Sequence, residues 1–334
     1  MAMNVVGLVT SEVGVGFSRD LPPVTECIGA ATVLPLLGGM GDTPLVEAKF
    51  EGKRGALFVS PQYGKFLVRN VSDDFWFVND GAVSAIGIDQ QREPAEWTHV
   101  ERLQLGKLEL HDLRALVVDR HFPAHVDGLP IVGIIGREFL TDYGLIELID
   151  IPHKKLALFR WDHDRCGSSS RLLGPDAHVA NLYDDGGVEG MIAGKHLRIH
   201  FNPDLDRNMF PLTGIAKLGL TAKALKERPQ VMLDFAGKNH GFLSEKVPVS
   251  VAGFDLAPQD FLVVENIERV SLGYRFFLTR TVIFDFGYRT FATVDANERD
   301  SLPPTKHLHF DSYNIVDIGV QESTGALPAP DQRK

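Results

Sequence analysis

One pattern of short segments occurs twice along the chain, and this repeat limits the available folds more than any other feature. In each copy a Gly-Lys turn leads into an apolar strand, which ends in a polar residue and a proline. The polar residue lies eight positions after the glycine, from Gly52 to Ser60 and from Gly194 to Asn202. Further matching segments follow in the same order: Leu105–Val118 with Ala252–Val264, and Ile134–Asp150 with Ser271–Asp285. The repeat predicts two homologous lobes of about 110–130 residues each.

The segments inside each lobe have the length and composition of β-strands. They are rich in Val, Ile, Leu and Phe and are bounded by Gly or Pro, as in Leu45–Phe50, Ala56–Val59 and Leu113–Val118. Short apolar runs with frequent turn residues indicate an all-β fold. The best candidates for helices are Gly214–Lys226 and Gly136–Tyr143.

The charge balance argues against nucleic acid as the main partner. The chain has 34 Lys and Arg against 44 Asp and Glu, a formal charge of −10, and no basic run that would supply a positive field. No stretch approaches the roughly 20 apolar residues that cross a bilayer, so no transmembrane segment is expected. The first residues also lack the basic and then apolar pattern of a secretory signal.

The most specific segment is Asp127–Leu140, in which Ile-Ile-Gly precedes a short helix pattern with Phe-Leu, and a strand ending in Asp150 follows. Together with the opening strand Val33–Leu37 and the segment Leu103–Asp119, it resembles the bacterial retropepsin-like aspartyl proteases with two fused lobes. The resemblance spans about residues 27–295 and is clearer in the first lobe. It implies a bilobal, aspartic-protease-like all-β fold whose lobes are related by a pseudo-twofold axis, with a cleft between them.

The repeat and the resemblance together predict the division of the chain. The linker between the lobes is rich in Ser, Gly and Asp, which is typical of a connecting segment. The two arms contain Pro pairs and apolar clusters; they either pack on their own lobes or reach a partner subunit. The predicted units are an N-terminal arm (1–30), a first β lobe (31–162), a linker (163–187), a second β lobe (188–297) and a C-terminal arm (298–334).

The catalytic Asp-Thr-Gly motif of this family is absent from both lobes. The corresponding segments read Ser60-Pro61-Gln62 and Asn202-Pro203-Asp204. Aspartic proteolysis needs two carboxylates that share one proton, and neither a serine hydroxyl nor an amide replaces a carboxylate. Proline in place of threonine also removes a hydroxyl and an N–H. No catalytic residue is therefore predicted; Ser60 and Asn202 are degenerate catalytic positions, and the cleft candidates are Pro61, Gln62, Tyr63, Pro203 and Asp204.

Asp204 or Asp206 is the alternative acid for a working site. A shift of two residues along a tight loop is expected to displace the carboxyl by several ångströms from the catalytic place. The first lobe also offers no nearby carboxylate before Asp73. Restored two-carboxylate catalysis is therefore the less favoured interpretation.

Four other residues are expected to have structural roles. Gly136 and Gly273 should each allow another strand or loop to pass closely, because a Cβ would crowd the crossing backbone. Cys27 and Cys166 flank the first lobe and form a possible disulfide if the two ends of that lobe meet. His121 and His125 have a metal-ligand spacing, but Pro123 places them in a loop, so neither a metal nor another cofactor is expected.

The function expected from these features is that of a catalytically inactive, protease-like binding or assembly (accessory) subunit of a larger complex. Its partner would be a protein or an extended peptide held in the former cleft. The alternative is an active peptidase or other hydrolase that uses a non-standard acid such as Asp204. Relatives with signal peptides would be periplasmic, so that location is expected if a signal peptide was removed from the chain.

Overall fold

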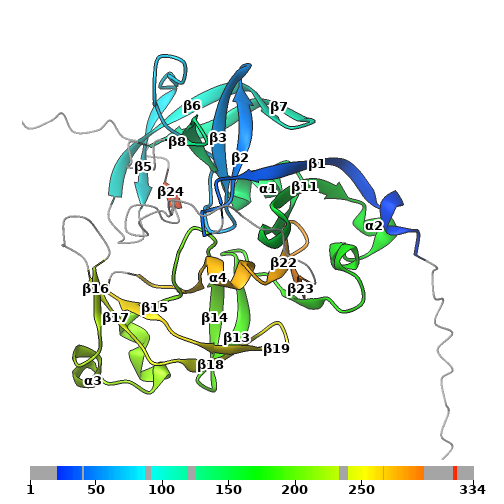
Figure 1. Ribbon diagram of the computed structural model, residues 1–334. Helices are drawn as coiled ribbons and strands as arrows, with labels where there is room; N and C mark the ends of the chain where they lie inside the picture. Colours follow the sequence, from blue (N-terminus) through cyan, green and yellow to red (C-terminus); the bar gives the residue numbers. More distant parts are fainter. Residues whose placement is uncertain are drawn as a thin grey trace, which may run out of the picture.

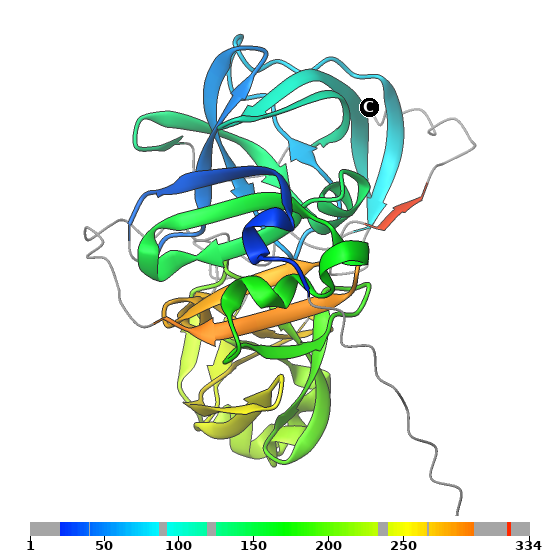
Figure 2. The same ribbon diagram turned by 90° about the vertical axis from the view of Figure 1, so that its right-hand side faces the viewer.

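Two β lobes lie one above the other with a shared layer of strands between them (Figures 1 and 2). The computed structural model describes residues 21–39, 41–86, 92–118, 125–232, 240–265, 267–296 and 319–321. Helices in this part of the chain are few and short. The expectation of a bilobal all-β fold is confirmed.

The upper lobe in Figure 1 is built from strands of the first half of the chain. Its sheet runs in the order β2, β3, β9, β4, β7, β6, β5, and a further pairing of β2 with β6 closes it on itself. The short β8 pairs with β9 at one end. The bounds are β2 (Leu45–Phe50), β3 (Lys53–Val59), β4 (Leu67–Val68), β5 (Gly81–Ile86), β6 (Arg92–Leu105), β7 (Leu108–Val117), β8 (His125–Val126) and β9 (Leu129–Ile135).

The lower lobe is a nine-stranded sheet from the second half of the chain. Its strands are ordered β16, β17, β20, β15, β21, β14, β13, β18, β19. The bounds are β13 (Gly187–Ile192), β14 (Lys195–Phe201), β15 (Met209–Pro211), β16 (Gln230–Met232), β17 (His240–Leu243), β18 (Val247–Val251), β19 (Phe254–Gln259), β20 (Leu262–Val264) and β21 (Val270–Leu272).

Six strands form the layer that joins the lobes, and each half of the chain supplies three of them. Their order is β12 (His178–Asn181), β23 (Thr290–Asp295), β22 (Arg280–Asp285), β10 (Ile146–Asp150), β11 (Lys155–Trp161) and β1 (Ile28–Leu37). The halves meet where β10 pairs antiparallel with β22, at Leu148 and Ile283. Figure 2 shows this layer between the lobes, with the orange β22 and β23 beneath the green β10 and β11. The pseudo-twofold axis of the fold relates the two sets of strands.

The strands that lead to the predicted site have the same pairing in both lobes. Strand β3 runs parallel to β9, with Val59 opposite Ile135, and β14 runs parallel to β21, with Phe201 opposite Leu272. A short strand then pairs antiparallel with each of these parallel partners: β4 pairs with β9, and β15 pairs with β21. The two copies of the sequence repeat therefore fold in the same way.

The helices follow the repeat in part. Helices α1 (Arg137–Asp142) and α4 (Tyr274–Phe277) begin directly after Gly136 and Gly273 in their respective lobes. The helix expected over Gly214–Lys226 is wrong as one element, because Gly219 adopts a left-handed conformation (φ 73°) and ends a 3₁₀ turn before α3 (Ala222–Lys226) begins. The other short elements are α2 (His163–Cys166), η1 (Val24–Glu26), η2 (Ile151–His153), η3 (Ser169–Leu173) and η4 (Leu212–Leu218).

The segments predicted as linker and arms contribute to this fold where they are described. The linker segment contains α2, η3 and β12, and β12 is an edge strand of the central layer. In the C-terminal arm, β24 (Gly319–Gln321) pairs antiparallel with β5 of the first lobe. Most of both arms lies outside the described residues. No helix among the described residues is long and apolar enough to cross a membrane.

The central layer separates two clusters of buried side chains. Ile149, Val282 and Phe284 belong to the large core that continues into both lobes. Residues of opposite parity, among them Ile146 and Ile283, pack on the other face together with the two cysteines. Because successive side chains of a strand point to opposite faces, this register also fixes which way Glu147 points.

Candidate functional site

The loops that follow β3 and β14 have equivalent hydrogen bonds. The backbone N–H groups of Ser60 and Asn202 donate to the carbonyls that end β9 and β21, at 3.0 and 2.8 Å. The side chains of the same two residues then accept from the backbone N–H two positions on. The Gln62 N–H lies 3.4 Å from Ser60 Oγ, and the Asp204 N–H lies 2.9 Å from Asn202 Oδ1. Ser60 and Asn202 therefore occupy corresponding positions in the two lobes.

Gly136 and Gly273 support these loops by leaving room for them. A Cβ on Gly136 would lie 2.5 Å from the carbonyl oxygen of Tyr63. A Cβ on Gly273 would lie 2.7 Å from the carbonyl oxygens of Leu205 and Arg207. In each case the obstacle is backbone, which cannot turn aside as a flexible side chain can. This is the close approach that the sequence analysis expects at both glycines.

The two loops meet through Ser60 and Asp204. Ser60 Oγ donates a hydrogen bond of 2.7 Å to Asp204 Oδ2, and both residues are buried. Asp204, one of the predicted cleft residues, therefore directly contacts the degenerate catalytic position of the other lobe. The loop curls back so that the Asp204 N–H bonds to the Asn202 side chain, and the Asp204 carboxyl then contacts the opposite lobe.

A second acid, Glu147, lies near this contact and was missed by sequence reasoning. It lies in β10, opposite Phe284 of β22, and its side chain shares the inward face of Ile149 and Phe284. Its residue surface is fully buried. Neither carboxyl oxygen has a hydrogen-bond partner among the described residues. The sequence did contain one indication of it. Because side chains alternate along a strand, Glu147 lies on the same face as Ile149 in an otherwise apolar strand.

Burial sets the protonation of both acids. Loss of water raises the pKa of Asp204 from 3.8 to about 7, and the hydrogen bond from Ser60 offsets part of that rise. Loss of water also raises the pKa of Glu147 from 4.5 to about 8, and the nearby charge of Asp204 adds to the rise. Both carboxyls are therefore mainly neutral below pH 7.

The predicted cleft residues, and with them the degenerate catalytic position Asn202, are buried at the junction. Gln62 and Tyr63 are 6% and 2% exposed, and Asn202 and Asp204 are 8% and 1% exposed. Pro61 and Pro203 are buried as well. The Asp204 carboxyl is therefore shielded from water and from a peptide, whereas Asp206, further along the same loop, is exposed.

Contacts from the second half of the chain also cover the first loop. Arg137 donates to the carbonyl of Gln62 at 3.0 Å and to the carbonyl of Asp184 at 3.1 Å, so its guanidinium connects the two halves. A Cβ on Gly186 would lie 3.2 Å from the carbonyl oxygen of Pro61, which shows how closely these segments pack. The junction is a packed contact between the lobes.

The remaining predicted residues lie elsewhere. Cys27 and Cys166 are joined by a disulfide with a Cα–Cα distance of 5.8 Å, on the far face of the central layer. His125 is exposed, and His121 is outside the described residues. No group of three or more potential metal ligands occurs among the residues that the structure describes.

Comparison with known proteins identifies the class of fold. The structure is similar to the crystal structure of an aspartic proteinase from Irpex lacteus, with a TM-score of 0.51 and 10% sequence identity. The match covers 80% of this chain and 98% of that chain. The protein therefore has the fold of the pepsin-like aspartic proteinases. No protein-family model and no curated protein sequence matches the chain.

Proposed function

We propose that this protein is a catalytically inactive, aspartic-protease-like binding or assembly subunit of a larger complex. The observation that supports this proposal is the burial of both loops where the catalytic residues of such a fold would lie. Ser60 is 0% exposed and Asp204 is 1% exposed, and they are hydrogen-bonded to each other. A catalytic pair must instead face a water molecule and the substrate.

The chemistry of the two corresponding positions supports the same proposal. In aspartic proteolysis one carboxylate acts as base on a water while the other, protonated, donates to the carbonyl. Ser60 contributes only a hydroxyl, and Asn202 contributes an amide that cannot take up a proton usefully. We propose that Ser60 and Asn202 replaced the two catalytic aspartates of an ancestor of the retropepsin-like type.

The contact between the two loops is suited to holding the lobes together. Proline at positions 61 and 203, where the family has threonine, lacks both the backbone N–H and the side-chain hydroxyl. The two loops therefore cannot use these groups to hydrogen-bond to each other. Ser60 and Asp204 supply a different cross-lobe hydrogen bond. Loops that hold two lobes together suit a scaffold whose function lies on its surface.

A periplasmic location belongs to the same proposal. The disulfide between Cys27 and Cys166 supports it, because such bonds persist in oxidising compartments. The location is tested by fractionating the source cells and probing for the protein in the periplasmic extract.

A second candidate function rests on the two buried carboxyls. Asp204 and Glu147 lie near each other with raised pKa values of about 7 and 8, in the range useful for acid–base chemistry. A hydrolase using this pair would have to open the junction to admit water and substrate. Hydrolysis that is lost in both Asp204→Asn and Glu147→Gln would favour this candidate over the first.

The primary proposal is tested by an active-site ligand and by the state of the native protein. A pepstatin-type inhibitor carries a statine hydroxyl that relies on an accessible carboxylate pair. We expect no shift in melting temperature with this compound between pH 3 and 7, and we expect the native protein to co-purify in a stoichiometric complex identified by mass spectrometry. A saturable stabilisation by the inhibitor, together with a monomeric native protein, would contradict the proposal.

A further inference from the structure

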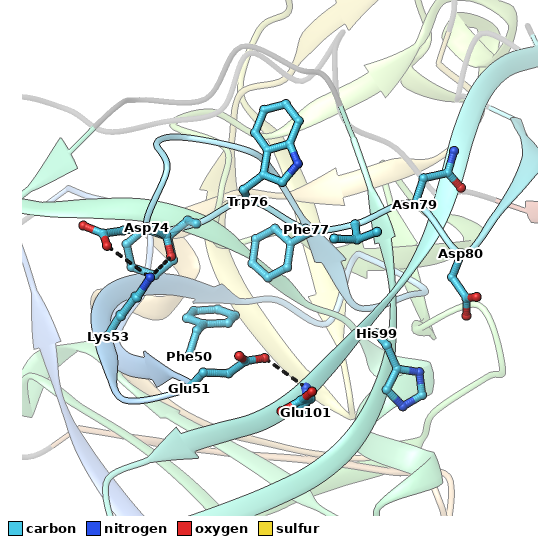
Figure 3. A pocket seen from close by; sticks show the side chains of 12 residues that line it. Phe50, Glu51, Lys53, Asp74, Trp76, Phe77, Asn79, Asp80, His99 and Glu101 are labelled. Atoms are coloured by element: carbon cyan, nitrogen blue, oxygen red, sulfur yellow. Dashed lines mark hydrogen bonds and ion pairs between the residues drawn. The ribbon is translucent and has the colours of Figure 1, made fainter.

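The first lobe carries a surface groove of about 580 Å³ (Figure 3), and none of the residues that line it belongs to the two junction loops. It lies between the hairpin of β2 and β3, the segment that precedes β5, and the middle of β6. Two phenylalanines, Phe50 and Phe75, form an apolar base; they are 3% and 5% exposed and meet edge to face at 5.9 Å. The base is therefore packed in advance of any binding.

Exposed apolar side chains border this base. Trp76 is 69% exposed and Val78 is 73% exposed, the two highest values among the large apolar residues that the structure describes. Two exposed apolar side chains from one short segment beside a groove mark a contact site more strongly than a single one does. Tryptophan is also among the residues that contribute most to binding energy at protein interfaces.

The groove is also strongly acidic. Glu51, Asp80 and Glu101 line it, together with Asp74, whose carboxylate pairs with Lys53 at 3.1 Å. Within the described chain no Lys or Arg forms an ion pair with the other three. Figure 3 shows Glu51 and Glu101 side by side, where Glu51 Oε1 accepts from the Glu101 backbone N–H at 3.2 Å. Figure 3 shows Trp76 across the groove from Glu51 and Glu101, with Phe77 between them, so the carboxylates and the exposed indole offer two separate places for cationic side chains.

We propose that this groove binds a basic segment of a partner protein, with one Arg or Lys side chain near Glu51 and Glu101 and a second one against the Trp76 ring on the other side of the groove. An apolar residue between these two cations would cover Phe50 and Phe75. The inference rests on the binding function proposed above and names the chemistry of the partner. Basic segments complement both the groove and a chain of formal charge −10.

The charge of the groove favours a basic protein segment over nucleic acid, a membrane surface or a second copy of this chain. Nucleic acid and anionic membrane surfaces would be repelled by the carboxylates. A second copy of this chain carries the same charge of −10, which opposes association at an acidic face. A basic protein segment satisfies both the apolar base and the acidic border.

The test uses a defined peptide as the probe. A fluorescent peptide of sequence Gly-Arg-Leu-Arg-Phe-Arg-Gly is titrated with the full chain, and anisotropy is measured at low and high ionic strength. The matched peptide carries Glu in place of every Arg. We expect only the Arg peptide to bind, and we expect its affinity to fall at least about fivefold at high salt.

Matched variants locate the binding. Trp76→Ala is expected to weaken binding about fivefold, and Glu101→Gln about threefold. Val78→Ala is compared with Val33→Ala, since Val33 is also an exposed valine (63%) but does not line the groove. Glu227→Gln, at the end of α3 in the other lobe, is the control for charge. Both controls should bind as the unmodified protein does.

Three results would overturn the inference. They are the absence of binding, equal affinity for the Arg and Glu peptides, and an affinity that Trp76→Ala and Glu101→Gln leave unchanged. Sedimentation analysis adds a fourth: a dimer that dissociates in Trp76→Ala would show that a second copy occupies the groove. None of these results bears on catalysis, so failure here is distinct from failure of the proposed function.

Discussion

Three buried residues determine the properties of the loop junction: Ser60, Asp204 and Glu147. Burying an acid without enough polar partners disfavours its charged form, and the response of a protein is to keep the acid protonated. Asp204 retains one strong partner in Ser60, whereas Glu147 has none among the described residues. The stability of the lobe contact should therefore depend on pH through these two groups.

The sign of this dependence follows from the raised pKa of each acid. The contribution of Glu147 to stability is fully present below its unfolded pKa of about 4.5 and is lost as pH rises through its folded pKa of about 8. Glu147→Gln removes the ionisation. We expect the free energy of unfolding of this variant, relative to the unmodified protein, to increase by up to about 5 kcal/mol between pH 4 and pH 9. Urea unfolding at the two pH values measures the difference, with Glu227→Gln as an exposed control; a difference that does not change with pH would show that Glu147 is not neutral in the folded state.

The paired glycines give a second prediction for single residues. Gly136→Ala places a methyl group 2.5 Å from the backbone oxygen of Tyr63, so the loop after β3 must move. We expect a loss of about 3 kcal/mol in the free energy of unfolding. Gly287→Ala is the control, because its new Cβ would approach only Asp285 Oδ1, at 3.9 Å. Equal midpoints for the two variants in urea unfolding would refute this account of the close approach.

Among the elements, the pairs that recur in the sequence are the ones that could be predicted. The strands that lead to Ser60 and Asn202 depend on a local pattern that occurs twice. The helix predicted after Gly136 is present, whereas the short helix after Gly273 was not among the predicted helices. The helix predicted over Gly214–Lys226 failed because apolar periodicity alone does not show that Gly219 takes a left-handed conformation. Boundaries of this kind depend on a single backbone angle.

The disulfide is the main covalent constraint between elements. It joins the start of β1 to α2 and closes a loop with a sequence separation of 139 residues. Because a long closed loop restricts the unfolded chain, the double variant Cys27→Ser, Cys166→Ser should lose about 3–5 kcal/mol of stability. Urea unfolding with and without a thiol reductant measures this loss, and the reductant should affect only the unmodified protein. Identical midpoints under all conditions would contradict the prediction.

For the whole molecule, the repeat and the short apolar segments were enough to predict two β lobes, and the resemblance specified their protease-like arrangement. The site was predictable only in part. Ser60 and Asn202 were placed in corresponding loops, but the contact of Ser60 with Asp204 depends on how a loop curls in space. Alternation in β10 indicates the face on which Glu147 lies, but its proximity to Asp204 depends on how the two halves of the chain pair, which no local pattern reveals. The groove at Trp76 was likewise not predicted, because its lining residues come from β2, β3, β6 and the segment before β5, which are separate in the sequence.

The central claim is that the junction of this protease-like fold carries out no proteolysis, and cleavage profiling tests it most directly. The native protein is incubated with a diverse library of peptides between pH 3 and pH 8, and every new peptide terminus is identified by mass spectrometry. Asp204→Asn, prepared in the same way, serves as the control for contaminating proteases. We predict the same set of background termini for both proteins at every pH. Specific cleavage by the unmodified protein that is absent in Asp204→Asn would contradict the account and identify Asp204 as a catalytic acid.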